Sequence, residues 1–174
     1  MNLKLIIALP LVKFPILASD TIVLREIEPS DMQSIMSISF YDAKVATTIE
    51  EATEMHNRIV ADYTNGETIH WGIADNSTNE IVGTLGYYRG FKNEVGELGC
   101  VLKPAFYGKG FMSKAMKLAI DFGKNELKLK RIAAITSQDN KKAIQLLERL
   151  NFRMTRKLED NELEFEHDFQ NTPL

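Results

Sequence analysis

The chain alternates between short stretches with period-two hydrophobic residues, typical of strands, and longer stretches in which hydrophobic residues recur at helical spacing. The first pattern, bounded by turn residues, predicts strands over residues 21–27, 68–74, 80–88, 93–102, 131–136, 152–159 and 162–169. The second pattern predicts helices over residues 32–39, 48–65, 113–127 and 139–150. These elements follow one another without a linker, a low-complexity tract or an internal repeat.

The order of the predicted elements indicates a mixed α/β fold, of the α+β kind, in one domain. Antiparallel strands come first, followed by a strand–helix–strand unit and by a closing hairpin around Asp160 and Asn161. A strand–helix–strand crossover joins parallel neighbours. We therefore expect Val101 and Ile135 to lie on adjacent parallel strands.

A glycine-rich turn, Tyr107-Gly108-Lys109-Gly110-Phe111, connects the strand and the helix of this unit. Glycine lets the backbone turn tightly and approach a ligand, and the helix that follows directs its free N–H groups into the turn. Such a turn can bind phosphate, because the N–H groups and the helix dipole both favour an anion. The sequence lacks both a Walker A run and the third glycine of a dinucleotide fingerprint. A loop for another phosphate-bearing ligand and an ordinary turn remain as interpretations.

Three segments resemble motifs of the GNAT N-acetyltransferases. Residues 97–113 resemble the central motif of that family, in which a strand, the glycine loop and a helix follow one another. Residues 140–152 resemble the second motif, an Asn that opens a helix ending in Gly-Phe, here Asn151-Phe152. Residues 14–25 resemble the opening of the branch that contains the ribosomal-protein N-terminal acetyltransferases. Together the segments are specific for the superfamily and only weakly specific for the substrate.

The resemblance implies a fold and a reaction. The GNAT fold is a mixed, mostly antiparallel sheet of about seven strands flanked by about four helices, in which two central parallel strands splay apart. The reaction is transfer of an acetyl group from acetyl-CoA to an amine, by direct attack of the amine on the thioester. The pantetheine arm of the cofactor lies in the gap between the splayed strands, and Gly99 would suit a bulge that opens this gap.

The resemblance also implies which residues bind acetyl-CoA. Main-chain groups of Cys100, Val101 and Leu102 would pair with the pantetheine arm like an extra strand, and one amide would polarise the thioester oxygen. Asn140 would hold the pantetheine or the far end of the cofactor, or would only cap its helix. The pyrophosphate would be bound by the amides, and in one case the hydroxyl, of Gly108, Lys109, Gly110, Phe111, Met112 and Ser113.

Glu97 is the candidate general base, because a carboxylate beside the site can take the proton that the amine loses. It could equally face solvent or anchor the substrate. Tyr87 and Tyr88 are candidates to line the acceptor cleft, although one of them could simply pack in the core.

The general acid is missing from its usual places. Many family members carry a Tyr or a Ser that can return a proton to the thiolate, and Leu147 and Ala143 hold those positions here. The alternative to an active enzyme is therefore a catalytically silent acyl-CoA-binding or scaffold protein of the same fold.

Composition restricts the partners. A formal net charge of −3 over 174 residues offers no basic surface of the kind that binds nucleic acid. The single cysteine and three scattered histidines show no metal-ligand spacing, so we expect no metal. The expected partner is an amine, either a small molecule such as a polyamine or a protein N-terminus. A homodimer is possible, since dimers are common in the branch that the chain resembles.

Residues 1–13 form an apolar extension in front of a single domain expected over residues 14–174. The extension imitates a signal peptide, but Pro10 and Lys13 interrupt it, and it is too short to span a membrane. We therefore expect a cytoplasmic protein without membrane contact. The extension should pack on its own domain or on a partner subunit.

Overall fold

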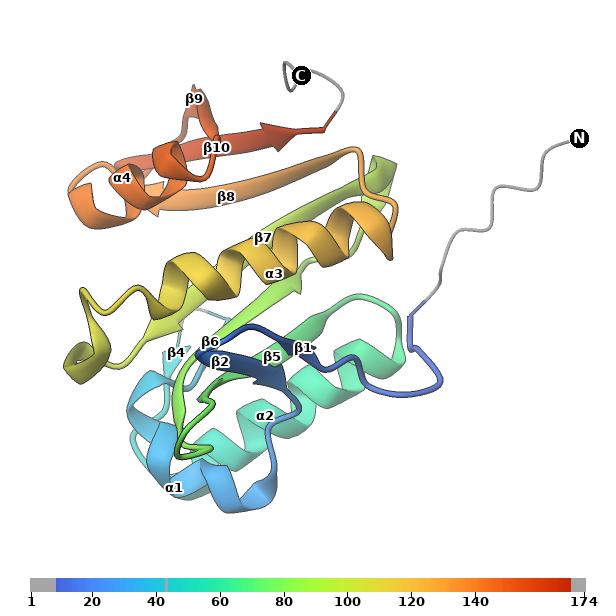
Figure 1. Ribbon diagram of the computed structural model, residues 1–174, viewed down its shortest axis with the longest axis vertical. Helices are drawn as coiled ribbons and strands as arrows, with labels where there is room; N and C mark the ends of the chain where they lie inside the picture. The colour runs from blue at the N-terminus through green and yellow to red at the C-terminus, as the bar shows by residue number, and fades with distance from the viewer. Residues whose placement is uncertain (1–8, 43, 170–174) are drawn as a thin grey trace, which may run out of the picture.

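An eight-stranded sheet forms the centre of the molecule in the computed structural model, which describes residues 9–42 and 44–169 (Figure 1). The order is β1-β2-β5-β6-β7-β8-β10-β9, and only the β7–β8 pair is parallel. The strands of this sheet are β1 (Leu17–Ala18), β2 (Ile22–Arg25), β5 (Ile69–Asp75), β6 (Ile81–Tyr88), β7 (Val95–Leu102), β8 (Arg131–Ser137), β9 (Arg153–Lys157) and β10 (Glu162–Asp168). A separate two-stranded sheet consists of β3 (Phe40–Tyr41) and β4 (Lys44–Val45).

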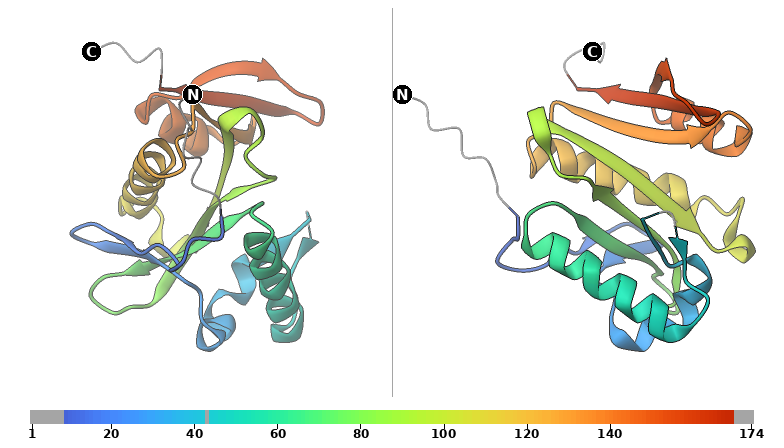
Figure 2. Two further views of the ribbon diagram at one scale, coloured as in Figure 1. Left: turned by 90° about the vertical axis from the view of Figure 1, so that its right-hand side faces the viewer. Right: turned by 180° about the vertical axis from the view of Figure 1, so that it is seen from behind.

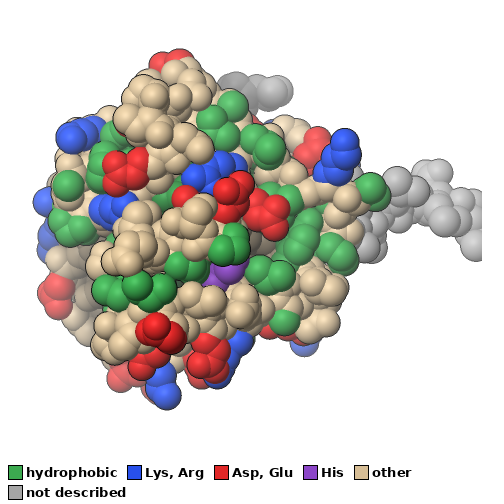
Figure 3. Space-filling view, turned by 90° about the horizontal axis from the view of Figure 1, so that it is seen from below, with side chains coloured by type: hydrophobic (Ala, Val, Ile, Leu, Met, Phe, Trp, Pro, Cys, Tyr) green, Lys and Arg blue, Asp and Glu red, His purple; other side chains and the backbone are tan. Residues whose placement is uncertain are grey.

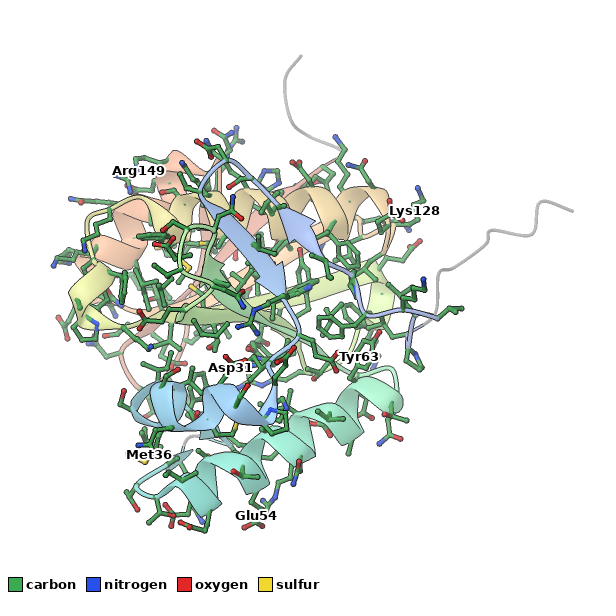
Figure 4. All side chains as sticks on the ribbon, turned by 60° about the horizontal axis from the view of Figure 1, so that its bottom comes forward. Asp31, Met36, Glu54, Tyr63, Lys128 and Arg149 are labelled. Atoms are coloured by element: carbon green, nitrogen blue, oxygen red, sulfur yellow. The ribbon has the colours of Figure 1, made fainter. Side chains whose placement is uncertain are left out.

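Helices cover both faces of the sheet, with α3 and α4 on one face and α1 and α2 on the other (Figure 2). The α-helices are α1 (Met32–Ile35), α2 (Ile49–Thr64), α3 (Phe111–Asn125) and α4 (Lys141–Arg149). On α2, Tyr63 points toward the sheet and Glu54 points away from it, as expected of an amphipathic surface helix (Figure 4). No helix in the described ranges is long and apolar enough to cross a membrane.

The main hydrophobic core lies between the sheet and α3. The side chain of Trp71 is fully buried there and meets the ring of Phe122 edge to face, with 5.3 Å between ring centroids. Tyr87 is also fully buried, and its hydroxyl donates to the carbonyl oxygen of Ala119 at 2.7 Å. Burying a large apolar side chain stabilises the fold by about 1.5–3 kcal/mol. A second cluster holds α1 against the opposite face and consists of Ile27, Met32, Ile35, Ile38, Ala74 and Ile81.

The described part of the N-terminal extension packs on its own domain. The N–H of Leu11 donates to the hydroxyl of Tyr63 at 3.1 Å, and Leu9 contacts the main core. Immediately after it, the ring of Phe14 lies 5.4 Å from that of Tyr63. The indole N–H of Trp71 donates to the carbonyl oxygen of Pro15 at 2.9 Å. Residues 1–8 lie outside the described residues.

The predicted strands and helices all occur, with shifted ends. The predicted helix over residues 32–39 is only partly α-helical, because α1 continues as a 3₁₀ turn over Met36–Ile38. Helix α3 begins at Phe111, two residues earlier than the prediction of 113–127. The two-residue strands β1, β3 and β4 were not predicted, because two residues cannot display an alternating pattern. The main sheet therefore has eight strands instead of about seven.

The splayed strand pair is confirmed. β7 and β8 pair at three positions, from Val95 opposite Arg131 to Glu97 opposite Ala133, and beyond these positions they diverge (Figure 1). β7 remains paired with β6 up to Leu102, and β8 remains paired with β10 up to its end. The predicted bulge at Gly99 is wrong, because the register between β6 and β7 continues through this residue without a shift.

Candidate active site

The glycine turn stands at the start of α3. Gly108 and Gly110 have φ angles of 76° and 80°, in the left-handed region that favours glycine, and Gly110 is the N-cap residue of the helix. A Cβ atom added to either glycine would meet no atom within 4 Å. The space beside both glycines is therefore open, next to the N-terminus of a helix.

The main-chain amides of this turn point to a bound anion. Those of residues 108–113 donate to no partner within the described chain, and the first helical bond runs from Lys114 N–H to Gly110 O at 3.3 Å. Amides of this kind, at the positive end of a helix dipole, are the usual ligands of a phosphate group. The six residues predicted for the pyrophosphate are consecutive in this turn, and their binding of a phosphate stays a prediction.

Two lysines near the turn rest on aromatic rings. Lys109 Nζ lies 5.1 Å from the ring centroid of Phe106, and Lys142 Nζ, from α4, lies 5.6 Å from that of Tyr107. Lys114 instead donates to Asp20 at 3.0 Å, so a neighbouring carboxylate already balances its charge. The remaining lysine charges are placed to favour a polyanion beside the turn.

The open edge of β7 continues from this turn. Cys100, Val101 and Leu102 pair with β6 on one side, and no β8 residue stands opposite them on the other. Cys100 is exposed at the surface, and partial desolvation by the surrounding protein raises the pKa of its thiol to about 11. A thiol that stays protonated near pH 7 is a poor nucleophile. This edge offers main-chain groups to an extended ligand rather than a reactive side chain.

Asn140 acts as the N-cap of α4. Its Oδ1 accepts a hydrogen bond from the amide of Ala143 at 3.1 Å. The side-chain amide group of Asn140 donates to no residue that the structure describes, so capping leaves it free for a ligand. Leu147, at the place where many family members carry Tyr, is buried in the main core with 4% exposure.

An anion-binding turn and an open strand edge together fit coenzyme A. The turn suits its pyrophosphate, and the edge suits its extended, amide-containing pantetheine arm, which can pair with β7 as another strand would. When bound, acetyl-CoA supplies an activated acetyl thioester.

A cleft of about 620 Å³ lies between the α1–α2 segment and strands β5, β6 and β7. Figure 3 looks at the molecule from below and shows a histidine among hydrophobic side chains, with Asp and Glu side chains nearby. Glu97 lines the cleft at the last position where β7 and β8 pair, so it stands where the gap begins. Its carboxylate accepts from the guanidinium of Arg89 at 2.6 Å. Arg89 is 74% exposed, whereas Glu97 is 29% exposed.

The two tyrosines predicted to line the cleft take different positions. Tyr88 lines the cleft. The prediction for Tyr87 is wrong, because successive strand residues face opposite sides of a sheet and Tyr87 faces the main core. The hydroxyl of Tyr88 lies 2.5 Å from Nδ1 of His70, which also lines the cleft. Sequence reasoning missed His70 as a site residue, because one histidine in a strand pattern gives no indication of its partner.

Comparison with known proteins agrees with this geometry. Residues 21–153 match the family model described as "Acetyltransferase (GNAT) domain". The uncharacterized N-acetyltransferase YoaA of Bacillus subtilis is 30% identical over 147 residues, which are 80% of this chain and 83% of that protein. The spermidine N(1)-acetyltransferase of Escherichia coli (strain K12) is 36% identical over 56 residues, or 32% of this chain and 30% of that protein.

A solved structure has the same fold. It is a RimL ribosomal-protein α-N-acetyltransferase in complex with coenzyme A, with a TM-score of 0.76 and 17% identity over 88% of this chain and 98% of that one. The family match covers more than half of the chain, and the chain has the splayed strand pair that the resemblance implied. The chain therefore belongs to the GNAT family and is an N-acetyltransferase, an enzyme that transfers an acetyl group from acetyl-CoA to an amine.

Proposed function

We propose that this N-acetyltransferase acetylates a small amine with more than one positive charge, of the polyamine class, bound in the cleft between α1, α2 and the sheet. The observation that carries this proposal is the charge of the cleft. The charged residues of its lining are Asp42, Asp62, Glu67, Glu97 and Arg89. Four carboxylates outnumber one guanidinium, so the field in the cleft favours a polycation.

The histidines of the cleft do not offset this negative charge. Burial lowers the pKa of His56, and burial lowers the pKa of His70 to about 3. Both imidazoles are therefore neutral near pH 7. The local similarity to an enzyme named for spermidine supports the same class of acceptor.

In this proposal each part of the site has one task. The amides of residues 108–113 bind the pyrophosphate, and main-chain groups of residues 100–102 align the thioester and polarise its carbonyl oxygen. Asn140 contributes its free amide group to the cofactor. These residues lie along the glycine turn, the open edge of β7 and the start of α4.

Glu97 takes the proton that the attacking nitrogen loses, directly or through a water molecule. An alkyl ammonium has a pKa of about 10.4, so the acceptor arrives protonated and needs such a base. The incoming ammonium replaces the exposed guanidinium of Arg89 at the carboxylate of Glu97. The thiol of the product CoA has a pKa of about 8.5, so its thiolate can leave without help from a strong acid. This agrees with the buried Leu147 at the place where many family members carry Tyr.

The test compares acceptors and variants by the initial rate of CoA release. Putrescine and spermidine should give kcat/KM values at least about tenfold above that of butylamine, because a second ammonium meets the carboxylates of the cleft. Glu97→Gln should lower kcat by about a hundredfold or more, because it removes the base. Asp62→Asn should instead raise the KM for spermidine.

Glu80→Gln provides the matched control, since Glu80 pairs with Lys103 outside the cleft and its loss should leave the kinetics unchanged. Equal rates for diamines and monoamines, or a preference for peptide N-termini, would contradict the proposed acceptor class.

A further inference from the structure

The ring of Tyr88 lies over glycines. Gly86 and Gly99 stand opposite each other on β6 and β7. A Cβ atom added to Gly99 would lie 3.0 Å from Cε2 of Tyr88, with no other neighbour nearer than that ring. A Cβ atom added to Gly86 would lie 2.8 Å from the Tyr88 hydroxyl and 2.6 Å from the carbonyl oxygen of Ile69. The ring therefore occupies the space that side chains would fill.

The backbone does not require glycine at these two positions. Neither Gly86 nor Gly99 is among the residues with positive φ. At Gly99, glycine is needed because the ring of Tyr88 fills the space of a side chain. At Gly86 the same ring and the close approach of β5 both exclude a side chain. The missing side chains at the two glycines let the ring of Tyr88 lie along the sheet. In this position its hydroxyl reaches His70, which stands opposite Gly86 on β5.

The two partners are uncharged near pH 7. Burial lowers the pKa of His70 to about 3, and burial raises the pKa of Tyr88 above its ordinary value. A group that resists both gaining and losing a proton is a poor acid or base near pH 7. The pair can act only by hydrogen bonding, and it does so in the cleft that Glu97 also lines.

We propose that the hydroxyl oxygen of Tyr88 binds the attacking nitrogen of the acceptor, and that His70 is a positioning residue that orients this hydroxyl. Nδ1 of His70 accepts a hydrogen bond from the Tyr88 hydroxyl, so the hydroxyl hydrogen points away from the substrate. The lone pairs of the oxygen are then available to accept an N–H of the amine. This inference rests on the proposed binding of the acceptor in this cleft.

A kinetic double-mutant cycle tests the inference with spermidine and acetyl-CoA. Tyr88→Phe and His70→Leu should each raise the KM for spermidine about tenfold and leave the KM for acetyl-CoA unchanged. The double variant should be no worse than Tyr88→Phe, because His70 acts through the hydroxyl. His70→Gln, which keeps an acceptor oxygen on a side chain of similar length, should recover part of the affinity.

Tyr87→Phe is the matched control. It removes the neighbouring tyrosine hydroxyl, which is bonded to Ala119 in the core, and should leave the KM for spermidine unchanged. The nitrogen NMR shifts of His70, assigned with the His70→Gln variant, should show a neutral ring with its proton on Nε2.

Three results would overturn the inference. Wild-type affinity for spermidine in Tyr88→Phe would remove the role of Tyr88, and independent, multiplying effects in the cycle would remove the role of His70. A proton on Nδ1 of His70 would reverse the required hydrogen bond. In all three cases the wild-type enzyme still acetylates spermidine, so the proposed function stands. A wild-type enzyme that acetylates no amine would overturn the proposed function, and this inference with it.

Discussion

At the scale of residues, Gly110 carries two requirements that can be separated. Its φ of 80° is strained for any residue with a Cβ, and its hydrogen atoms leave open the space in front of the unpaired amides. Gly90 offers a matched comparison, because its φ is 77° and a Cβ there also meets nothing within 4 Å. Gly90 lies in the loop between β6 and β7, away from the helix N-terminus.

We predict that Gly110→Ala and Gly90→Ala each lower the free energy of unfolding by about 1–2 kcal/mol, because both force a Cβ into the left-handed region. Only Gly110→Ala should also raise the Kd for acetyl-CoA, by about tenfold or more, since its methyl group enters the proposed phosphate site. Denaturant unfolding and calorimetry measure the two effects. Equal acetyl-CoA affinity in both variants would show that the turn does not hold the cofactor.

At the scale of elements, the side chain that caps α4 keeps a second polar group available for the proposed cofactor. Asn140 uses its oxygen to cap the helix and leaves its amide group unused among the described residues. Serine can supply the capping oxygen but has no amide group, whereas alanine supplies neither.

We predict that Asn140→Ala destabilises the protein by about 1 kcal/mol and that Asn140→Ser changes its stability by less than about 0.5 kcal/mol. Both variants should raise the KM for acetyl-CoA severalfold, because both lose the donor. Thermal unfolding and initial rates measure these effects. A serine variant with the wild-type KM would leave Asn140 with the capping role alone.

Long elements could be predicted from the sequence, because alternation and helical spacing persist over many residues. The glycine turn was equally accessible, since its chemistry belongs to one continuous segment. The pairing of His70 with Tyr88 could not be predicted, because these residues are 18 apart in the sequence. Their contact depends on the register of the strands and on the direction of the Tyr88 side chain. The sequence also could not tell Tyr87 from Tyr88, because period-two alternation fixes opposite faces without stating which face is the core.

At the scale of the whole molecule, three partly buried histidines contribute to the response to acid. Burial lowers the pKa of His56, His70 and His167 below the ordinary value of 6.5. For Asp31, burial alone would raise the pKa, but hydrogen bonds from Arg25 and from the Glu28 N–H outweigh it and lower the pKa. The unfolded chain therefore binds more protons than the folded one, first at its histidines and then at such carboxylates.

We predict that the free energy of unfolding is highest above about pH 6.5 and falls as the pH decreases toward 4. Folding favours the neutral form of each histidine. The contribution of the histidines to the free energy of unfolding is therefore fully present above their pKa in the unfolded chain and is lost as the pH falls below it. With a folded pKa of about 3, His70 alone accounts for at most about 2 kcal/mol at pH 5.

Urea unfolding at pH values from 7 to 4 measures this dependence. The free energy of unfolding of His70→Gln should fall less with decreasing pH than that of the wild type. The same pH dependence in both proteins would show that His70 is not held neutral by the fold.

The proposed cofactor site consists mostly of main-chain groups, namely the amides of residues 108–113 and the free edge of β7. Every residue except proline carries the same main-chain donor and acceptor, so these groups survive most exchanges of side chain. The proposed acceptor cleft, in contrast, is built from side chains such as those of Glu97 and Tyr88. Substitutions therefore change the proposed cofactor site little, whereas they readily change the side chains that line the proposed acceptor cleft. An enzyme built in this way can change its acceptor over evolution without giving up its acyl donor.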